Sequence, residues 1–496
     1  MTNKERYEKL TTYLDDIRTY YHAMGLISFD QQTIAPKKAY DEQSETLAKL
    51  SSKVFKITQD PEYVKLVLEL HNNPKGLNFY QKRLITVLYR RYISNKNITP
   101  EMEYEFSMAY HKSYASWMKA KNASEYSLFK DDFKKIVEYT RLFESLREDR
   151  KKTPYDTLLN DYEEGGSIEQ LDAIFNRLKE AIIPLLKSIE NSNYKPREDF
   201  LSRKVSIKKQ EKFSHYLMKL IGLDMDATLL STTEHPFTSM ISRHDVRITT
   251  HYYEDMFLSN VYSTIHEGGH ALYGQNESKK AWDYYINDTM TSGSHECMSR
   301  FYENMIGRSK GFIHYIYPKF HKSFKEFKDI SEEELYQGIN IAKASLIRTE
   351  ADELTYCLHI IIRYEIEKML INGEVDVEQL PSLWNQKYKE YLGIDVLNDK
   401  EGILQDVHWS GGSFGYFPSY ALGNLYAAQL MHYMRKDFDV DEALSTGKII
   451  KFKKWLCKKA FPYGSLMDVN DWIIKVTGEP LNPQYYIDYL TEKFKI

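Results

Sequence analysis

Residues 256–273 read Met-Phe-Leu-Ser-Asn-Val-Tyr-Ser-Thr-Ile-His-Glu-Gly-Gly-His-Ala-Leu-Tyr. Apolar and small residues recur here at helical spacing and predict a helix with one face in a core: Phe257, Val261, Thr264, Ile265, Gly268 and Leu272. His266 and His270 are one turn apart, so both rings leave the helix on the same side and can share a metal ion. Glu267 lies beside them, where it would reach a water in the ion's open position. The alternative is a helix that carries two histidines and a glutamate by chance.

Two glycines, Gly268 and Gly269, interrupt this helix. Each costs about 1 kcal/mol relative to alanine in a helix interior. A sequence that keeps both therefore predicts close backbone packing, or access to the site, at this point.

A third metal ligand is expected from a neighbouring helix. Residues 291–294 resemble a turn rich in N-cap residues, and they precede an apolar stripe that includes Phe301 and Met305. The segment from Gly274 to Gly293 is long enough to reverse the chain and set the two helices side by side. Glu296 then becomes the third ligand. Three protein ligands and a water are typical of a catalytic zinc site rather than a structural one.

These motifs together resemble the thermostable carboxypeptidase Taq family of metallocarboxypeptidases. His-Glu-Gly-Gly-His-Ala-Leu-Tyr-Gly-Gln, beginning at His266, is followed by the pair His295-Glu296. Four further motifs stand in the family's order, at residues 235–237 (His-Pro-Phe), 245–249 (Asp-Val-Arg-Ile-Thr), 347–352 (Ile-Arg-Thr-Glu-Ala-Asp) and 402–409 (Gly-Ile-Leu-Gln-Asp-Val-His-Trp). The resemblance runs from Phe29-Asp30 to Thr477-Gly478. One departure is Met298, where the family usually has Gln, and it affects a hydrogen bond near the metal.

The resemblance implies an all-α fold with a small β-sheet at the active site. The architecture would be neurolysin-like or angiotensin-converting-enzyme-like, with two helical halves around a deep cleft, and the protein would be a homodimer. The implied activity is removal of single residues from peptide C-termini with broad preference. Zinc would be the cofactor, and cobalt could occupy the same ligands. Glu267 would take a proton from the attacking water and pass it to the leaving amine.

Arg348 is the expected anchor for the free C-terminal carboxylate of the peptide. A guanidinium can hold a carboxylate with two parallel hydrogen bonds, and residues 345–359 have a strongly helical pattern. The alternative is a structural salt bridge between Arg348 and Asp352, four residues later. If Arg348 binds the substrate, Asp352 would orient the arginine. Arg247 is the next residue to test.

A donor is also needed near the oxyanion of the tetrahedral intermediate. The candidates for this substrate-binding role are Tyr420, His408 and His235. Tyr420 is the first choice, and each of the three has a structural alternative. The loop from His408 to Leu425 is rich in glycine and aromatic residues, so it is expected to run under or along the cleft. Asp406 and Gln405 are expected to hold this loop in place.

The rest of the chain is expected to be helical. Residues 1–165 form a helical N-terminal part, Gly165-Gly166 marks a joint, and residues 166–496 carry the site; together they make a single catalytic domain. The one convincing strand pattern is Asp245–Tyr253, which alternates just before the metal helix. That strand could pair with an extended substrate backbone or form a supporting ribbon.

Composition excludes several classes of protein. The net charge is −4 and the basic residues are dispersed, so nucleic acid is not an expected partner. The mean hydropathy is −0.56, no apolar run approaches a membrane span, and the charged start lacks a signal-peptide core. Three widely spaced cysteines fit a reduced interior without disulfides. We expect a cytoplasmic protein.

Two rival functions remain at this point. A metallo-oligopeptidase would use the same chemistry but cut internally, without using Arg348 for a terminal carboxylate. A non-catalytic helical binding protein would carry a relic of the site, although the intact set of His266, His270, Glu296 and Arg348 argues against it. Comparing a blocked peptide with its C-terminally amidated twin separates all three.

Overall fold

The structure is a computed structural model that describes residues 1–287 and 289–495. In these ranges it is mainly helical, with one small sheet. The first half of the chain contains helices α1 (Asn3–Thr33), α2 (Tyr40–Thr58), α3 (Pro61–Asn72), α4 (Phe79–Asn95), α5 (Pro100–Ala123), α6 (Ser127–Ser145), α7 (Pro154–Tyr162), α8 (Ile168–Glu190) and α9 (Ile207–Ile221). The expected helical N-terminal part is thus confirmed, and α8 runs through Pro184 as one helix.

The helices that carry the motifs follow the sheet. They are α10 (Phe257–Asn276), α11 (Lys279–Asp283), α12 (Ser292–Arg300), a π-helical segment η3 (Phe301–Gly307), α13 (Lys310–Ser323) and α14 (Glu332–Ile339). The remaining helices are α15 (Tyr356–Ile371), α16 (Leu380–Leu392), α17 (Phe417–Asp437), α18 (Val440–Ser445), α19 (Ile450–Lys459), α20 (Val469–Thr477) and α21 (Gln484–Phe494).

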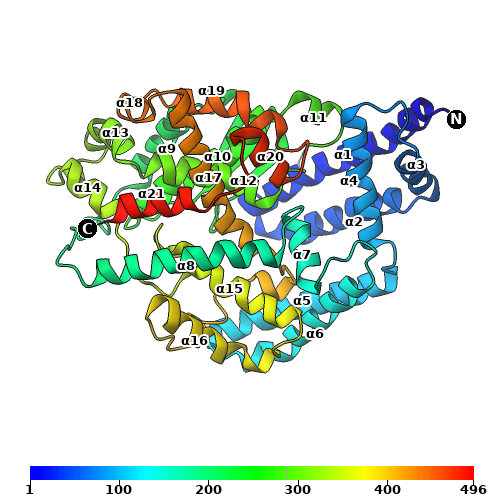
Figure 1. Ribbon diagram of the computed structural model, residues 1–496, viewed down its shortest axis with the longest axis horizontal. Helices are drawn as coiled ribbons and strands as arrows, with labels where there is room; N and C mark the ends of the chain where they lie inside the picture. Colours follow the sequence, from blue (N-terminus) through cyan, green and yellow to red (C-terminus); the bar gives the residue numbers. More distant parts are fainter. Residues whose placement is uncertain (288, 496) are drawn as a thin grey trace.

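Three of these helices lie at the middle of the molecule. In Figure 1, α10, α12 and α17 occupy the centre, the N-terminal helices α1–α4 extend to one side, and the C-terminus lies at the opposite end. All three central helices contribute to the large hydrophobic core, with residues such as Ile265, Cys297 and Leu425 fully buried. A smaller cluster joins α1, α3 and α4 to the segment that includes Ala281.

The sheet has three strands in the order β1 (Thr228–Thr232), β3 (Asp245–Thr250), β2 (Thr238–Ser242). β1 pairs with β3 in parallel, with Leu230 opposite Ile248, and β2 pairs with β3 antiparallel. β3 is the strand predicted from the sequence, and it is the central one. Because its backbone groups are already paired on both sides, β3 cannot add a substrate strand and is a supporting element.

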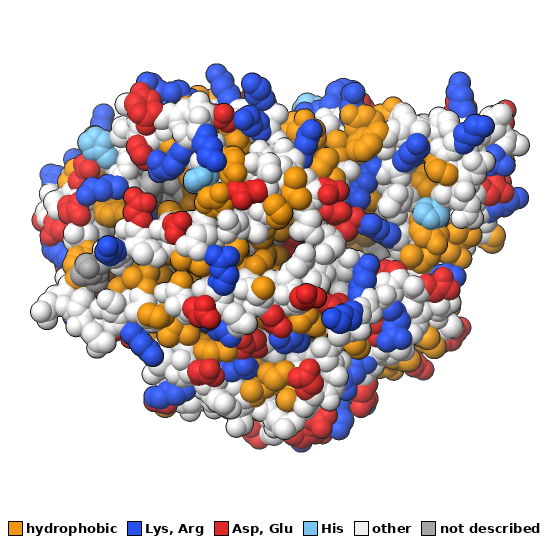
Figure 2. Space-filling model, in the orientation of Figure 1, with side chains coloured by type: hydrophobic (Ala, Val, Ile, Leu, Met, Phe, Trp, Pro, Cys, Tyr) orange, Lys and Arg blue, Asp and Glu red, His pale blue; other side chains and the backbone are white. Residues whose placement is uncertain are grey.

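The surface in Figure 2 carries acidic and basic side chains interspersed over the visible face. Within the described ranges, no helix combines the length and the apolar character that crossing a bilayer requires.

Candidate metal centre

Two glycines let the helix with the His-Glu-Gly-Gly-His motif approach its neighbours. A Cβ at Gly269 would lie 2.4 Å from the carbonyl oxygen of Met298 on α12, and a Cβ at Gly268 would lie 2.4 Å from Ile221 Cδ1 on α9. At Gly269 the neighbour is backbone, which cannot give way to a larger residue, whereas at Gly268 it is the end of a side chain. Gly269 therefore sets α10 directly against α12, and Gly268 lies against α9, which is the close packing that the cost of the two glycines in helix stability predicted.

This approach brings three donor atoms together. The Nε2 atoms of His266 and His270 lie 3.8 and 3.5 Å from Glu296 Oε2. The ligand atoms of the three residues are all within 4.8 Å of one another. The imidazoles keep 18% and 16% of their surface exposed, so the donors face a space that solvent reaches.

The other nitrogen of each imidazole is held by a neighbour. His266 Nδ1 lies 2.8 Å from Glu303 Oε2, and His270 Nδ1 lies 2.6 Å from His295 Nδ1. A carboxylate accepts, so His266 carries its proton on Nδ1. Burial lowers the pKa of His295 to about 3, with the neighbouring His270 acting in the same direction, so His295 is neutral. These two contacts fix the orientation of the His266 and His270 rings, with the Nε2 atom of each directed towards Glu296.

Glu296 is fixed from two sides. Arg300, one turn later on α12, donates from Nε to Glu296 Oε1 at 2.7 Å and leaves Oε2 for the histidines. A Cβ at Gly423 of α17 would lie 2.6 Å from Glu296 Cγ, so α17 packs directly over this side chain. Burial raises the pKa of Glu296, but Arg300 and His266 outweigh it and hold the pKa below its usual range. The residue is a carboxylate.

The donor set fits a divalent transition metal. Ligand distances of about 2.0–2.1 Å at tetrahedral angles would separate neighbouring donors by roughly 3.3 Å, close to the two measured separations. Two imidazole nitrogens and one carboxylate oxygen are the ligands of many catalytic zinc sites. The same three residues would hold the ion, which would supply Lewis-acid chemistry at this point.

Glu267 follows His266 on α10 and is not one of the three donors. Its Oε2 accepts a hydrogen bond of 2.6 Å from the hydroxyl of Thr238, on β2, and the residue is 6% exposed. The contact leaves Oε1 available. Thr238 thus links the sheet to α10 and orients the carboxylate, which gives the sheet a direct role at the site.

Arg348 is buried on the 3₁₀ turn η5 (Arg348–Glu350) and is held by Asp406. Its Nε and Nη2 atoms lie 2.9 and 2.8 Å from Asp406 Oδ1, and Nη1 donates to the Tyr356 hydroxyl at 3.3 Å. Asp406 also accepts from Arg363 Nε at 2.6 Å. A guanidinium has five N–H donors. Three of them are engaged in these contacts.

Two expectations about this segment are wrong. Residues 345–359 do not form one helix, because α15 begins only at Tyr356. Asp352 does not pair with Arg348; it accepts from the backbone N–H groups of Lys343, Leu354 and Thr355. These bonds cap the chain before α15, and such local side-chain bonds compete with helix. The partner of Arg348 is Asp406, 58 residues later.

The loop after Asp406 is tied down as expected. Gln405 accepts from the Arg348 N–H at 3.1 Å and from Arg363 Nη2 at 2.9 Å. Burial raises the pKa of Asp406, but Arg363 and Arg348 outweigh it and hold the pKa below the usual range. Asp406 and Gln405 therefore anchor the segment that leads to His408.

The structure brings two of the three candidate oxyanion donors together. His408 Nε2 lies 3.4 Å from the Tyr420 hydroxyl, and burial lowers the pKa of His408 to about 4. Tyr420 lies one turn before Gly423 on α17, and the Arg348 guanidinium is 5.1 Å from its ring. His235 is exposed between β1 and β2, three residues before Thr238.

Sequence reasoning missed Glu303 and Thr238, and it also missed the supporting role of His295. Glu296, Arg300 and Glu303 follow each other at spacings of four and three, which places them on one helical face and could have indicated an ion-pair network. His295 was noted only as part of a motif. Thr238 gave no signal, because β2 is short and rich in serine and threonine. Met298, the departure from the family pattern, is fully buried in the hydrophobic core.

Comparison with known proteins identifies the family of this chain. The sequence profile of the carboxypeptidase Taq (M32) metallopeptidases matches residues 9–494. Carboxypeptidase 1 of Bacillus subtilis is 42% identical over 484 residues, which cover 97% of this chain and 96% of the relative. The M32 carboxypeptidase of Deinococcus radiodurans has a TM-score of 0.95 at 29% identity, covering 99% of both chains. Metallocarboxypeptidase 1 of Trypanosoma cruzi has a TM-score of 0.94 at 31% identity, covering 99% of this chain and 100% of the other. The chain, with its His–His–Glu donor set, therefore belongs to the carboxypeptidase Taq (M32) family of metallopeptidases and is a metallocarboxypeptidase.

Proposed function

We propose that this protein is a zinc-dependent carboxypeptidase that releases single residues from peptide C-termini with broad preference. The observation that carries the proposal is the convergence of His266 Nε2, His270 Nε2 and Glu296 Oε2. Glu267 follows His266 on α10, and Thr238 holds its carboxylate. A zinc ion bound there would polarise a carbonyl and acidify a water. Cobalt suits the same donors.

In this mechanism Glu267 moves the proton. Its Oε1 takes a proton from the attacking water as the water oxygen bonds to the scissile carbonyl carbon. When the C–N bond breaks, Glu267 gives that proton to the leaving amine nitrogen. Thr238 keeps the carboxylate in place through its bond to Oε2. The Tyr420 hydroxyl is the proposed donor to the oxyanion, with His408 against it and His235 as the third candidate.

Arg348 supplies the selectivity for a chain end. Two of its N–H groups remain after Asp406 and Tyr356 are satisfied, and a peptide carboxylate can accept both. Arg247, the alternative anchor, is paired with Asp245 through two bonds of 2.8 Å. Arg247 belongs to β3, and its guanidinium lies over the Phe29 ring of α1, 5.2 Å from the centroid. Arg348 is therefore the first choice.

The substitution Glu267→Gln tests the mechanism. It changes no candidate metal ligand, so metal content should stay at the wild-type level, while kcat should fall by about 10²–10⁴-fold. Thr238→Val is the matched control, because it removes the support of Glu267 and should lower kcat less. A Glu267→Gln protein with full metal content and near wild-type turnover would exclude Glu267 as the base.

Two further features complete the proposal. We infer that the chain works as one catalytic domain, residues 1–496, in a cytoplasmic homodimer. Sedimentation analysis of the purified protein tests the dimer. A metallo-oligopeptidase would cut a C-terminally amidated peptide as fast as the free acid, and a non-catalytic binding protein would cut neither.

A further inference from the structure

Glu163, the residue that follows α7, joins two helices that meet at the metal centre. Its side chain is buried, with the residue 1% exposed. Its Oε1 atom accepts from the Gly293 N–H in the first turn of α12 and from the Ser419 hydroxyl of α17, the latter at 2.8 Å. Thr291, the N-cap of α12, is a further side-chain hydrogen-bond partner of this carboxyl group. One carboxyl group thus holds the start of α12 against α17.

The same two helices meet again one turn further on, at a metal ligand. Glu296 comes three residues after Gly293 on α12, and Gly423 comes four residues after Ser419 on α17. A Cβ at Gly423 would lie 2.6 Å from Glu296 Cγ, and a Cβ at Gly293 would lie 2.6 Å from the Oε1 atom of Glu163. With a rise of about 1.5 Å per residue, the two contacts are roughly 5 Å apart along the helices. A shift of the first contact therefore displaces the second.

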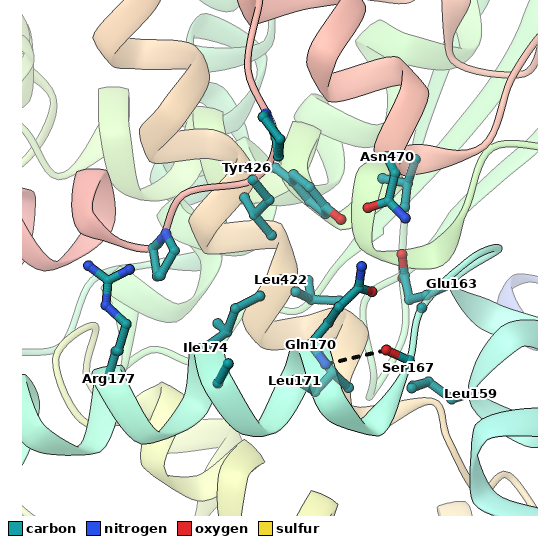
Figure 3. A pocket seen from close by; sticks show the side chains of 16 residues that line it. Leu159, Glu163, Ser167, Gln170, Leu171, Ile174, Arg177, Leu422, Tyr426 and Asn470 are labelled. Atoms are coloured by element: carbon teal, nitrogen blue, oxygen red, sulfur yellow. Dashed lines mark hydrogen bonds between the residues drawn. The ribbon is translucent and has the colours of Figure 1, made fainter. Parts of the chain in front are cut away.

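The turn that carries Glu163 is itself fixed by the glycine pair that marks a joint in the sequence. The Glu163 carbonyl oxygen accepts from the Gly166 N–H at 2.8 Å, and the Gly165 N–H donates to Asn160 Oδ1 at 3.0 Å. Gly165 has a φ of +88°, a conformation that glycine adopts without strain. Figure 3 shows Glu163 and Ser167 where the chain enters α8. The carboxyl group is therefore held on a turn with a defined backbone.

Removal of this carboxyl group would leave buried donors without an acceptor. The Gly293 N–H and the Ser419 hydroxyl would lose their shared partner, and an unsatisfied buried donor is unfavourable. The N-terminus of α12 would also lose a negative group that its dipole favours. To regain partners, the start of α12 would move relative to α17, and Glu296 lies one turn along.

We propose that Glu163 is a positioning residue for the metal ligand Glu296. By fixing the start of α12 on α17, Glu163 sets where Glu296 Oε2 lies opposite the Nε2 atoms of His266 and His270. Arg300 holds the carboxylate group of Glu296, whereas Glu163 holds the helix that carries it. The inference rests on the proposed zinc site and adds the residue that aligns its carboxylate ligand.

The zinc affinity of the full-length protein, measured by chelator competition, tests this assignment. Glu163→Leu removes the acceptor and should raise the zinc Kd at least about tenfold, the lower end of the loss when a supporting partner of a metal ligand is removed. Glu163→Gln keeps an oxygen that can accept both bonds, so its zinc Kd should stay close to that of wild type.

Glu367 on α15 provides the matched control. It is also a fully buried carboxyl group with three donors, which are the Tyr155 hydroxyl, the Trp409 Nε1–H and the Gly415 N–H. None of these donors belongs to α12. Glu367→Leu should therefore lower Tm, as Glu163→Leu does, and leave the zinc Kd unchanged.

Ser419→Ala is the milder variant in case Glu163→Leu does not fold. It removes one bond and leaves the bond from Gly293, so the zinc Kd should rise, but less than in Glu163→Leu. The absorption spectrum of the cobalt-loaded protein is a second readout, because it reports the geometry of the ligands rather than overall stability. The spectrum should change in Glu163→Leu and Ser419→Ala and stay as wild type in Glu367→Leu.

Two results would overturn the inference in distinguishable ways. If the wild-type protein binds zinc but Glu163→Leu keeps the wild-type Kd and cobalt spectrum, Glu163 supports the fold and does not position Glu296. The same result in Ser419→Ala decides the matter if the leucine variant does not fold. A wild-type protein that binds no zinc would overturn the metal centre itself, and the positioning of its ligand with it.

Discussion

The replacement of Arg348 separates recognition of the chain end from support of the fold. If two N–H groups of Arg348 hold the peptide carboxylate, their charge-assisted bonds contribute about 1.5–3 kcal/mol, which is roughly a ten- to hundredfold preference for a free acid over an amide. Arg348→Ala should remove that preference. Arg348→Lys keeps the charge but loses the planar fork, so it should fall most of the way towards alanine.

The structure also predicts the effect of Arg348→Ala on stability. Asp406 keeps Arg363 as a partner at 2.6 Å, so the carboxylate is not left buried and alone. The loss in the free energy of unfolding should therefore be smaller than the roughly 3–5 kcal/mol seen when a buried charge loses its only partner. Chemical denaturation measures this loss.

Arg363 provides the matched control, because it shares Asp406 and is fully buried. The assay compares kcat/KM for an N-terminally blocked peptide and its amidated twin. Arg363→Lys should destabilise the protein and preserve the acid-to-amide ratio, whereas Arg348→Ala should collapse the ratio. The account of Arg348 would be refuted if its alanine variant kept the wild-type ratio, or if both variants lost it equally; Arg247 would then be tested.

Three further predictions concern the metal centre. Glu303→Gln weakens the hold on His266 Nδ1 and should reduce zinc affinity about 10–100-fold in a chelator competition; unchanged affinity would mean that Glu303 does not orient the ligand. Removing the metal should lower Tm, because an ion at about 1,000 times its Kd stabilises the fold by roughly 4 kcal/mol. Glu267→Gln should show the same drop in Tm on metal removal, whereas His270→Ala should show no drop because it lacks a ligand. A full drop in Tm for His270→Ala would contradict the ligand assignment. Gly269→Ala places a Cβ against the Met298 carbonyl oxygen and should cost about 1–3 kcal/mol of unfolding free energy, measured with urea; an unchanged value would argue against close packing of α10 on α12.

Local patterns predicted the parts of this molecule that depend on local geometry. The spacing of His266 and His270 fixes their common side on α10, and the N-cap residues before Ser292 mark the start of α12. The two glycines indicated close packing, although not which helices would meet there.

Contacts between residues that are distant in the chain could not be predicted from the sequence. Arg348 pairs with Asp406 rather than Asp352, because Asp352 is used to cap the backbone before α15. β1 and β2 are five-residue strands without a strong alternating pattern, so the sheet's edges and the Thr238–Glu267 bond were not foreseen. The family resemblance supplied the fold class, which composition and helical periodicity alone left open.

The most direct test of the account is a time course of product masses from one N-terminally blocked peptide. The protein is first stripped of metal and then restored with zinc. We predict no cleavage before zinc is added and, afterwards, a ladder of products that shorten by one residue at a time from the C-terminus. Internal fragments as the first products, or an equal rate in the stripped protein, would contradict a carboxypeptidase that works through a metal held by His266, His270 and Glu296.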